Sequence, residues 1–288
     1  MNYSLGKLLA VSLLAVGCAA AYPTAGTLNL NGYDNFVGAF TVSSAPGAGE
    51  PTVSGYGGGF GGNITSANQS YLAVLFCVDF SNDVNIPSST SVNITPLAAG
   101  TQFNDDTRFG DVTSWRPVQD YLPAGSPSLG TSVENTINNA TALQRYEMAA
   151  YLVSNYTFFS AVPPQSDAYY SNATDLGIQS AIWAILDPTS DLYLPPSSGS
   201  GDITTWLTNA AEWLSNDANS PAGQQLLSRF RIVSDTDIAG SSNKTQVGIQ
   251  EFLTVVPVPE PSFYGALGAG LAILFWAARR KGVLTKGT

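Results

Sequence analysis

One thiol and one carboxamide are the side chains in this chain best suited to chemistry. Cys77 lies in Phe76-Cys77-Val78-Asp79, and Gln179 lies in Ile178-Gln179-Ser180-Ala181-Ile182-Trp183. A Cys acts as a nucleophile through its thiolate, although free Cys is also a common, inert core residue. On a helix, Gln179 and Trp183 share a stripe with Leu186. Gln179 should therefore face apolar neighbours, where an unpartnered amide costs about 1–3 kcal/mol.

Residue counts make Cys77 stand out further. The chain has two Cys and no His. The absence of His excludes Ser-His-Asp and Cys-His catalytic arrangements and zinc sites that use His. The other thiol, Cys18, lies in the leader described next, so the mature chain keeps Cys77 alone. Exported proteins usually pair their cysteines, and a single leftover thiol points to a special role or a buried position.

The first 21 residues have the layout of a secretion signal. Lys7 precedes an apolar run from Leu8 to Val16, and small residues close the stretch at positions 18–21. This order is typical of a signal peptide, and the run is too short for an ordinary membrane-spanning helix. We expect signal peptidase to cut near Ala20 or Ala21. Lipid attachment at Cys18 is the alternative, although Ala15 is a poor residue for the front of a lipobox.

The last 33 residues, 256–288, have three parts in a fixed order. A Pro-Glu-Pro segment is followed by an uncharged stretch from Phe263 to Ala278 and then by a basic cluster. The stretch, 263–278, is about 24 Å long as a helix, slightly short of a bilayer core, and its basic end should face the cytoplasm. This order resembles the PEP-CTERM sorting signal of Gram-negative bacteria, which the membrane protease exosortase cuts. A plain membrane anchor is the alternative. The sorting residues are Pro259, Glu260, Pro261, Arg279, Arg280 and Lys281.

The mature chain is strongly acidic. The tails hold five of the 11 basic residues, which leaves six against 21 acidic residues between positions 22 and 260. The resulting net charge of about −15 repels nucleic acid and anionic lipid headgroups. We therefore expect no nucleic-acid partner. The protein should reach the outer cell surface or the extracellular matrix after transient anchoring in the inner membrane.

Sequence patterns predict an α+β fold for residues 22–255. Residues 27–80 read as strands and turns, 71–80 being apolar on both faces as in a doubly buried strand. Apolar residues at a period near 3.6 then predict helices. The expectation is a β-sandwich or barrel-like sheet with an inserted helical lobe. Its other parts are a Gly-rich loop or bulged hairpin at 53–62, a strand near 92–94, helices at 141–155, 171–186 and 202–216, and a returning strand at 247–255.

The two motifs together resemble the thioester domains of Gram-positive surface adhesins. That family combines an aromatic residue or Leu, Cys, an apolar residue and Asp or Asn with a downstream apolar-Gln-x-x-apolar-Trp segment. This chain matches at Phe76, Cys77, Val78, Asp79, Ile178, Gln179, Ile182 and Trp183. The resemblance covers residues 27–255, although only the two motifs are specific. The sorting tail departs from the family, whose members mostly use a Gram-positive wall-anchoring signal.

The resemblance implies an internal thioester between Cys77 and Gln179. The thiol would attack the side-chain carbonyl of Gln179 and ammonia would leave, with folding supplying the proximity. Asp79 would orient neighbouring groups or accept a proton, and packing around Trp183 would exclude water. A surface amine or hydroxyl of a partner would then open the bond and become covalently attached. Each molecule reacts once, so the chain is not expected to be an enzyme, and the resemblance implies neither cofactor nor metal.

Other sites and functions compete with this interpretation. Asn104, Asp105, Asp106 and Asp111 offer oxygen ligands for Ca²⁺, without the spacing of an EF-hand. Glu147 and Glu212 show no sign of converging as a glycosidase pair, and the aromatics of segment 56–60 are candidates for a sugar groove. The main alternative function is a non-covalent structural or biofilm-matrix protein sorted by exosortase, with Cys77 a buried, inert thiol. A hydrolase is disfavoured by the missing His.

Overall fold

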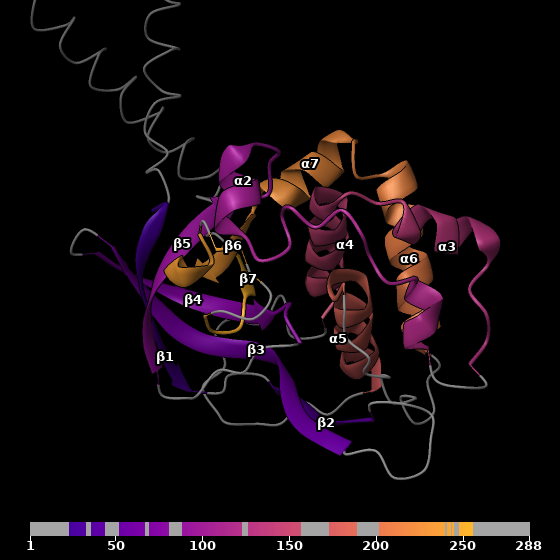
Figure 1. The fold of residues 1–288 in the computed structure, drawn as a ribbon, viewed down its shortest axis with the longest axis horizontal. Coiled ribbons are helices and arrows are strands. Elements are labelled where there is room, and N and C mark those ends of the chain that lie inside the picture. The colour runs from indigo at the N-terminus through magenta and orange to yellow at the C-terminus, as the bar shows by residue number, and fades with distance from the viewer. Residues whose placement is uncertain are drawn as a thin grey trace, which may run out of the picture. The chain divides into compact units, whose positions relative to one another are not determined.

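A computed structural model describes residues 23–32, 36–43, 52–66, 69–80, 88–122, 126–156, 173–188, 202–239, 241–242, 244 and 248–255. Residues 23–256 form one compact unit. Within the described ranges, strands lie on one side of this unit and most helices on the other (Figure 1). The tails that carry the predicted signal peptide and the sorting signal lie outside the described residues.

Six antiparallel strands close into a barrel. The strand order is β1 (Ala25–Gly32), β5 (Ser88–Pro96), β6 (Phe230–Asp235), β7 (Phe252–Val255), β4 (Gln69–Cys77) and β3 (Thr52–Ser66), and β3 pairs back to β1. A seventh strand, β2 (Phe36–Ser43), pairs only with the first half of β3. The barrel-like sheet is therefore confirmed, and the sandwich alternative is wrong because the strands share one closed hydrogen-bonded ladder.

The Gly-rich segment is a central strand, which corrects the loop or bulged hairpin expected at 53–62. The first half of β3, residues 52–58, pairs with β2. Residues 59–66 pair with β4, and residues 61–65 pair with β1 as well. A Cβ on Gly62 would lie 3.0 Å from the main-chain oxygen of Asn29 and 3.2 Å from Leu75. Glycine there lets neighbouring strands approach closely, and such positions weaken the local signal for a strand.

The helices are inserted between β5 and β6, as the sequence predicts. They are α2 (Thr101–Asp106), α3 (Thr131–Asn138), α4 (Ala142–Ser154), α5 (Ala173–Leu186), α6 (Asp202–Asn216) and α7 (Pro221–Ser228), together with a short 3-10 turn, η1 (Val118–Tyr121). A second 3-10 turn, η2 (Thr236–Ile238), follows β6. The three helices expected at 141–155, 171–186 and 202–216 correspond to α4, α5 and α6. Two strands, β6 and β7, return to the barrel where one was expected.

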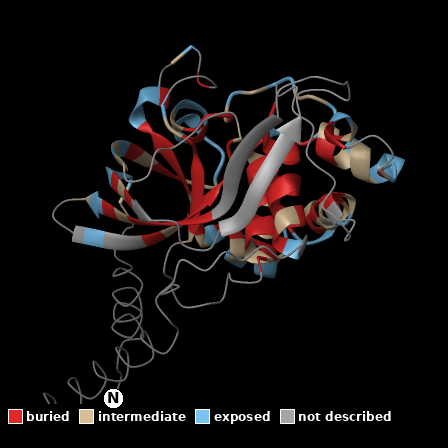
Figure 2. Ribbon diagram, turned by 90° about the horizontal axis from the view of Figure 1, so that it is seen from below, coloured by how far each residue is buried: buried red, intermediate tan, exposed pale blue. Residues whose placement is uncertain are grey.

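Local sequence explains where α4 begins. The Thr141 hydroxyl accepts from the Gln144 main-chain N–H, and the Gln144 side chain accepts from the Thr141 N–H at 2.9 Å. This reciprocal capping box satisfies two N–H groups that the helix start would leave unpaired. Apolar residues on α4 then pack against α5 and α6. Figure 2 shows the buried faces of these helices beside the buried strands, with exposed residues around the outside.

Helix α5 is the central helix. Every residue from Gly177 to Asp187 is buried, and the helix contacts α4, α6 and β3. A helix that is apolar all round has to be covered on all sides. Any polar group on it, including Gln179, must therefore find its partners inside the protein.

Candidate functional site

Cys77 is the last residue of β4 and lies at the junction between barrel and helices. It pairs with Phe252 of β7, and its side chain is 0% exposed. The next main-chain N–H, that of Val78, donates to the main-chain oxygen of Glu251 at 3.2 Å, so the chain stays bound to the barrel after the strand ends. Of the described residues, Cys77 is the one cysteine, and it is not part of a disulfide.

The structure brings Gln179 against Cys77. The carboxamide nitrogen of Gln179 donates to the main-chain oxygen of Cys77 at 3.0 Å. One turn later on α5, the indole N–H of Trp183 donates to the Cys77 sulfur at 3.4 Å. The stripe predicted from helical periodicity therefore faces the predicted thiol, and Gln179 is 0% exposed.

A tyrosine holds the other end of the carboxamide. The Tyr156 hydroxyl, just beyond the end of α4, donates to Gln179 Oε1 at 2.7 Å. Its ring stacks on Phe76, the residue before Cys77, with centroids 5.7 Å apart and planes 12° from parallel. Both polar atoms of the Gln179 side chain thus have hydrogen-bond partners, which offsets the free-energy cost of burying an amide.

The sulfur has a second N–H donor, Gln250, in the segment leading into β7. Gln250 Nε2 lies 2.7 Å from the Cys77 sulfur and 2.7 Å from the main-chain oxygen of Asp79. The thiol itself donates to that Asp79 oxygen at 3.4 Å. The thiol, the Gln250 side chain and the main chain of Asp79 therefore form one hydrogen-bonded unit.

The Asp79 carboxylate points to an arginine. Arg108 Nε lies 2.6 Å from Asp79 Oδ2, and both side chains are 0% exposed. The Arg108 guanidinium also donates to the main-chain oxygens of Ile249, at 2.7 Å, and Lys244. Asp79 thereby ties the Cys77 segment to the loop after α2 and to the segment before β7. Of the roles expected for it, orientation of neighbouring groups fits this geometry.

A buried carboxyl group extends this network. Glu251 accepts from the Arg108 main-chain N–H at 2.8 Å, from the Ser234 hydroxyl at 2.5 Å and from the Tyr146 hydroxyl. Burial raises the pKa of Glu251, and the Arg108 charge opposes that rise. Burial and the adjacent Glu251 also raise the pKa of Tyr146. The network links β6, α4 and the loop after α2 to Glu251, whose main-chain oxygen also accepts from the Val78 N–H.

Aromatic side chains surround the pair. Trp183 is 3% exposed, and its ring meets Phe80 edge-on with centroids 4.6 Å apart. Tyr156 and Phe76 close another side of the site, and Ile178 and Ile182 are fully buried on α5. Such surroundings exclude water from a bond that water could hydrolyse.

Sequence reasoning missed Tyr156, Gln250 and Arg108. Tyr156 follows a predicted helix and belongs to no motif. Gln250 and Glu251 fall within the segment expected as a strand at 247–255, whereas β7 spans only Phe252–Val255. The available signal was that Gln250 and Glu251 are both polar and adjacent. Consecutive residues of a strand point to opposite faces, so two polar neighbours do not fit a strand that is buried on both faces.

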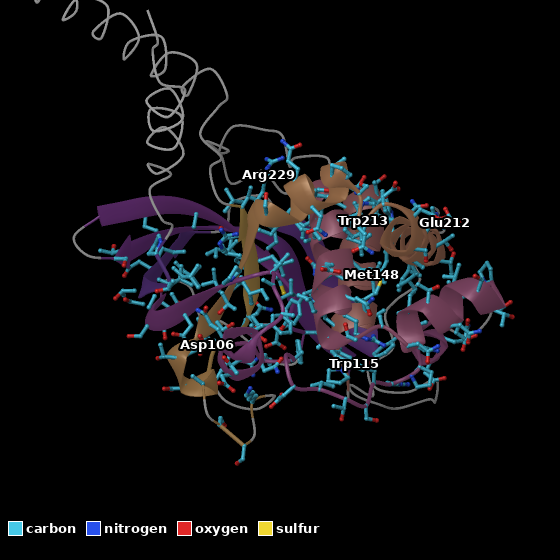
Figure 3. All side chains as sticks on the ribbon, turned by 90° about the horizontal axis from the view of Figure 1, so that it is seen from above. Asp106, Trp115, Met148, Glu212, Trp213 and Arg229 are labelled. Carbon is cyan, nitrogen blue, oxygen red and sulfur yellow. The ribbon has the colours of Figure 1, made fainter. Side chains whose placement is uncertain are left out.

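The competing sites gain little from the structure. Lys244 Nζ contacts Asp111 at 3.3 Å and the main-chain oxygen of Asn104, so an ammonium group already lies where Ca²⁺ was considered. Among the described residues, no three His, Cys, Asp or Glu side chains gather as a metal site. Burial raises the pKa of Glu147, with no charge contribution from Glu212, so these two show no coupling as a glycosidase pair. Figure 3 labels Glu212 among the helices and Asp106, from the calcium candidate, nearer the strands. Phe60, from the sugar-groove candidate, is 3% exposed and packs on Phe252.

The predicted tails lie outside the residues that the structure describes. Residues Pro259, Glu260, Pro261, Arg279, Arg280 and Lys281 lie outside the described residues, as do the cleavage region near Ala20 and the helix expected at 263–278. Where the structure is described, it contains no helix with the length and apolar character needed to cross a bilayer.

Comparison with known proteins adds no identity. No family model, curated protein or solved structure matches this chain. The function therefore has to be argued from the geometry around Cys77 and Gln179.

Proposed function

We propose that residues 22–255 form a covalent binding module, in which Cys77 and Gln179 join as an internal thioester that a partner's amine opens. The observation that carries the proposal is the position of the Gln179 carboxamide, which is hydrogen-bonded to the main-chain oxygen of Cys77 at one end and to the Tyr156 hydroxyl at the other, one helical turn from the Trp183 N–H that contacts the Cys77 sulfur. A nucleophile and an electrophile held together in this way react far faster than free groups, since the entropy of their encounter is lost on folding.

The reaction proposed is a single event per molecule. Bond formation joins the Cys77 sulfur to the Gln179 side-chain carbon and releases ammonia. A partner amine, such as a Lys side chain, then replaces the sulfur, leaving an amide on Gln179 and a free Cys77 thiol. A hydroxyl would give an ester in the same manner. Because the module is consumed, it acts as an adhesin and not as an enzyme.

Export and sorting belong to the same proposal. The signal peptide at 1–21 and the PEP-CTERM-like tail at 256–288 would bring the module to the cell surface or biofilm matrix of a Gram-negative bacterium. Signal peptidase and exosortase would be its processing partners. Glu260→Ala should leave the tail uncut, so that an antibody to residues 282–288 still detects the protein in the inner-membrane fraction. Loss of the tail in this variant, as in wild type, would contradict the sorting role.

Complete burial favours one second candidate. Cys77 and Gln179 are both 0% exposed, and Gln250 already bonds to the sulfur. This is also the environment of an inert core thiol. In that case the protein would be a non-covalent structural or matrix protein delivered by the same sorting tail.

Treating the purified protein with methylamine separates the two candidates. The covalent module should take up one methylamine at Gln179 and release the Cys77 thiol, both visible by peptide mass mapping. Cys77→Ala should take up none, and the exposed Gln225 should stay unmodified in the wild type. Absence of label at Gln179 in the wild-type protein would refute the covalent function and leave the matrix protein.

A further inference from the structure

The acyl oxygen of Gln179 has a fixed hydrogen-bond donor. Tyr156 is 3% exposed, and its hydroxyl lies 2.7 Å from Gln179 Oε1. The stacked Phe76 ring holds the Tyr156 ring in place next to Cys77. A donor positioned before the reaction stabilises charge that develops on the oxygen without reorganising during the reaction.

The Tyr156 hydroxyl keeps its proton in this setting. Burial, and then the electrostatic influence of Cys77 and Asp175, holds the pKa of Tyr156 well above its ordinary value of 10.0. A phenol with its proton donates a hydrogen bond, whereas a phenolate would repel a developing oxyanion. The side chain is therefore a donor throughout the pH range in which proteins are exported and fold.

The Cys77 sulfur has hydrogen-bond donors of its own. Trp183 Nε1 and Gln250 Nε2 both direct N–H groups at it, at 3.4 and 2.7 Å. Hydrogen bonds to an ionised group are stronger than those between neutral groups. These two donors consequently favour the thiolate, the form in which sulfur attacks and the form in which it leaves.

We propose that Tyr156 is the oxyanion donor of the thioester reaction, with Gln250 and Trp183 as the donors that stabilise the thiolate. This inference rests on the proposed function and assigns the chemical roles within its site. The same three donors serve both bond formation and capture, because both pass through an oxyanion on Gln179 Oε1 and a thiolate on Cys77.

The atoms balance in each step. In formation, the sulfur adds to Gln179 Cδ and the negative charge moves to Oε1. The C–N bond then breaks, and the thiol proton leaves with the nitrogen as ammonia. In capture, the amine nitrogen adds to Cδ and the charge returns to Oε1 beside Tyr156. The C–S bond breaks and the amine proton passes to the sulfur. No oxidant, reductant or further reactant is needed.

The test is Tyr156→Phe, which keeps the ring stacked on Phe76 and removes only the hydroxyl. Methylamine-induced release of the Cys77 thiol is followed with a thiol-reactive dye. Removing one oxyanion donor slows comparable reactions by about 10²–10³-fold, so we expect thioester formation and thiol release to slow by about 100-fold or more. Tyr151→Phe is the matched control on α4, because Tyr151 stacks on Trp213 away from the site, and it should react at the wild-type rate.

A spectroscopic measurement separates catalysis from a loss of folding. With ¹³C-labelled glutamine, the thioester carbonyl band of the wild-type protein should lie at lower frequency than that of Tyr156→Phe, because the hydroxyl weakens the C=O bond. An unchanged band, or a release rate within a few-fold of wild type, would overturn the role of Tyr156 while leaving the thioester intact. A wild-type protein that releases no thiol would overturn both this role and the proposed function.

Discussion

Removal of the Asp79 carboxylate tests whether the Cys77 segment is held by a buried ion pair. In Asp79→Ala, Arg108 would keep its main-chain acceptors, the oxygens of Ile249 and Lys244. It would lose the carboxylate 2.6 Å from its Nε atom. Both partners are 0% exposed, so no water replaces the missing charge, and the variant leaves a buried cation without its counter-ion.

The expected loss follows from that burial. Deleting one partner of a buried ion pair typically costs about 3–5 kcal/mol, mostly because the remaining charge is uncompensated. The main-chain acceptors that Arg108 retains place the expected loss near the lower end of this range. In a domain of this size each kcal/mol lowers the melting temperature by about 2–4 °C, so the expected drop is roughly 6–12 °C.

Differential scanning calorimetry of the purified protein measures the effect. The matched control is Asp120→Ala, which breaks an exposed pair with Arg116 in which Nε and Oδ2 are 3.9 Å apart. Exposed pairs contribute about 0–1 kcal/mol, so the control should melt within a few degrees of wild type. In Asp79→Ala/Arg108→Met, part of the lost stability should return. Equal melting temperatures for Asp79→Ala and the control would refute the argument from burial.

Three further predictions concern the scaffold. Gly62→Ala should lower the free energy of unfolding by about 1–3 kcal/mol through overpacking; an unchanged urea midpoint would contradict the close strand approach. Burial raises the pKa of Glu251 above 4.5, so the folded state binds more protons and stability falls as pH rises from 4.5 through the folded pKa. Urea titrations at several pH values should show that Glu251→Gln lacks this fall in the free energy of unfolding. If the wild type and the variant lose stability in parallel as pH rises, the raised pKa of Glu251 is not the cause. Thr141→Ala removes a capping box and should cost about 1 kcal/mol. Thr136→Ala, whose hydroxyl donates to the Ser132 main-chain oxygen within α3, should cost less, and the reverse order would be inconsistent with the cap.

Local signals account for the parts of the fold that sequence could predict. The helical period of residues 141–155 and the apolar run at 71–80 each report one element's own burial, and both elements are present as α4 and β4. The segment 53–62 was predicted wrongly because its glycines lie within a paired strand, where Gly61 and Gly62 have partners in both β1 and β4. Closure of the barrel could not be read from sequence either, since it depends on the pairing of β3 with β1 across the whole sheet.

Some residues of the site could also be predicted from local sequence, and others could not. Gln179 and Trp183 share a helical stripe, so their common direction follows from spacing alone. Tyr156 and Gln250 reach the pair from the end of α4 and from the segment before β7. Their positions depend on tertiary packing. Tyr156 has no local signal in the sequence, and for Gln250 the only one is the polar residue next to it, Glu251. The charge pairing of Asp79 with Arg108 likewise joins residues from different loops.

The most direct test of the covalent account is peptide mass analysis of the purified exported protein after digestion with pepsin at acidic pH. The account predicts that the peptides containing Cys77 and Gln179 are recovered as one linked species, lighter than the two separate peptides by one ammonia. Methylamine treatment before digestion should separate them. Recovery of both peptides unlinked and at full mass from untreated wild-type protein would contradict the thioester.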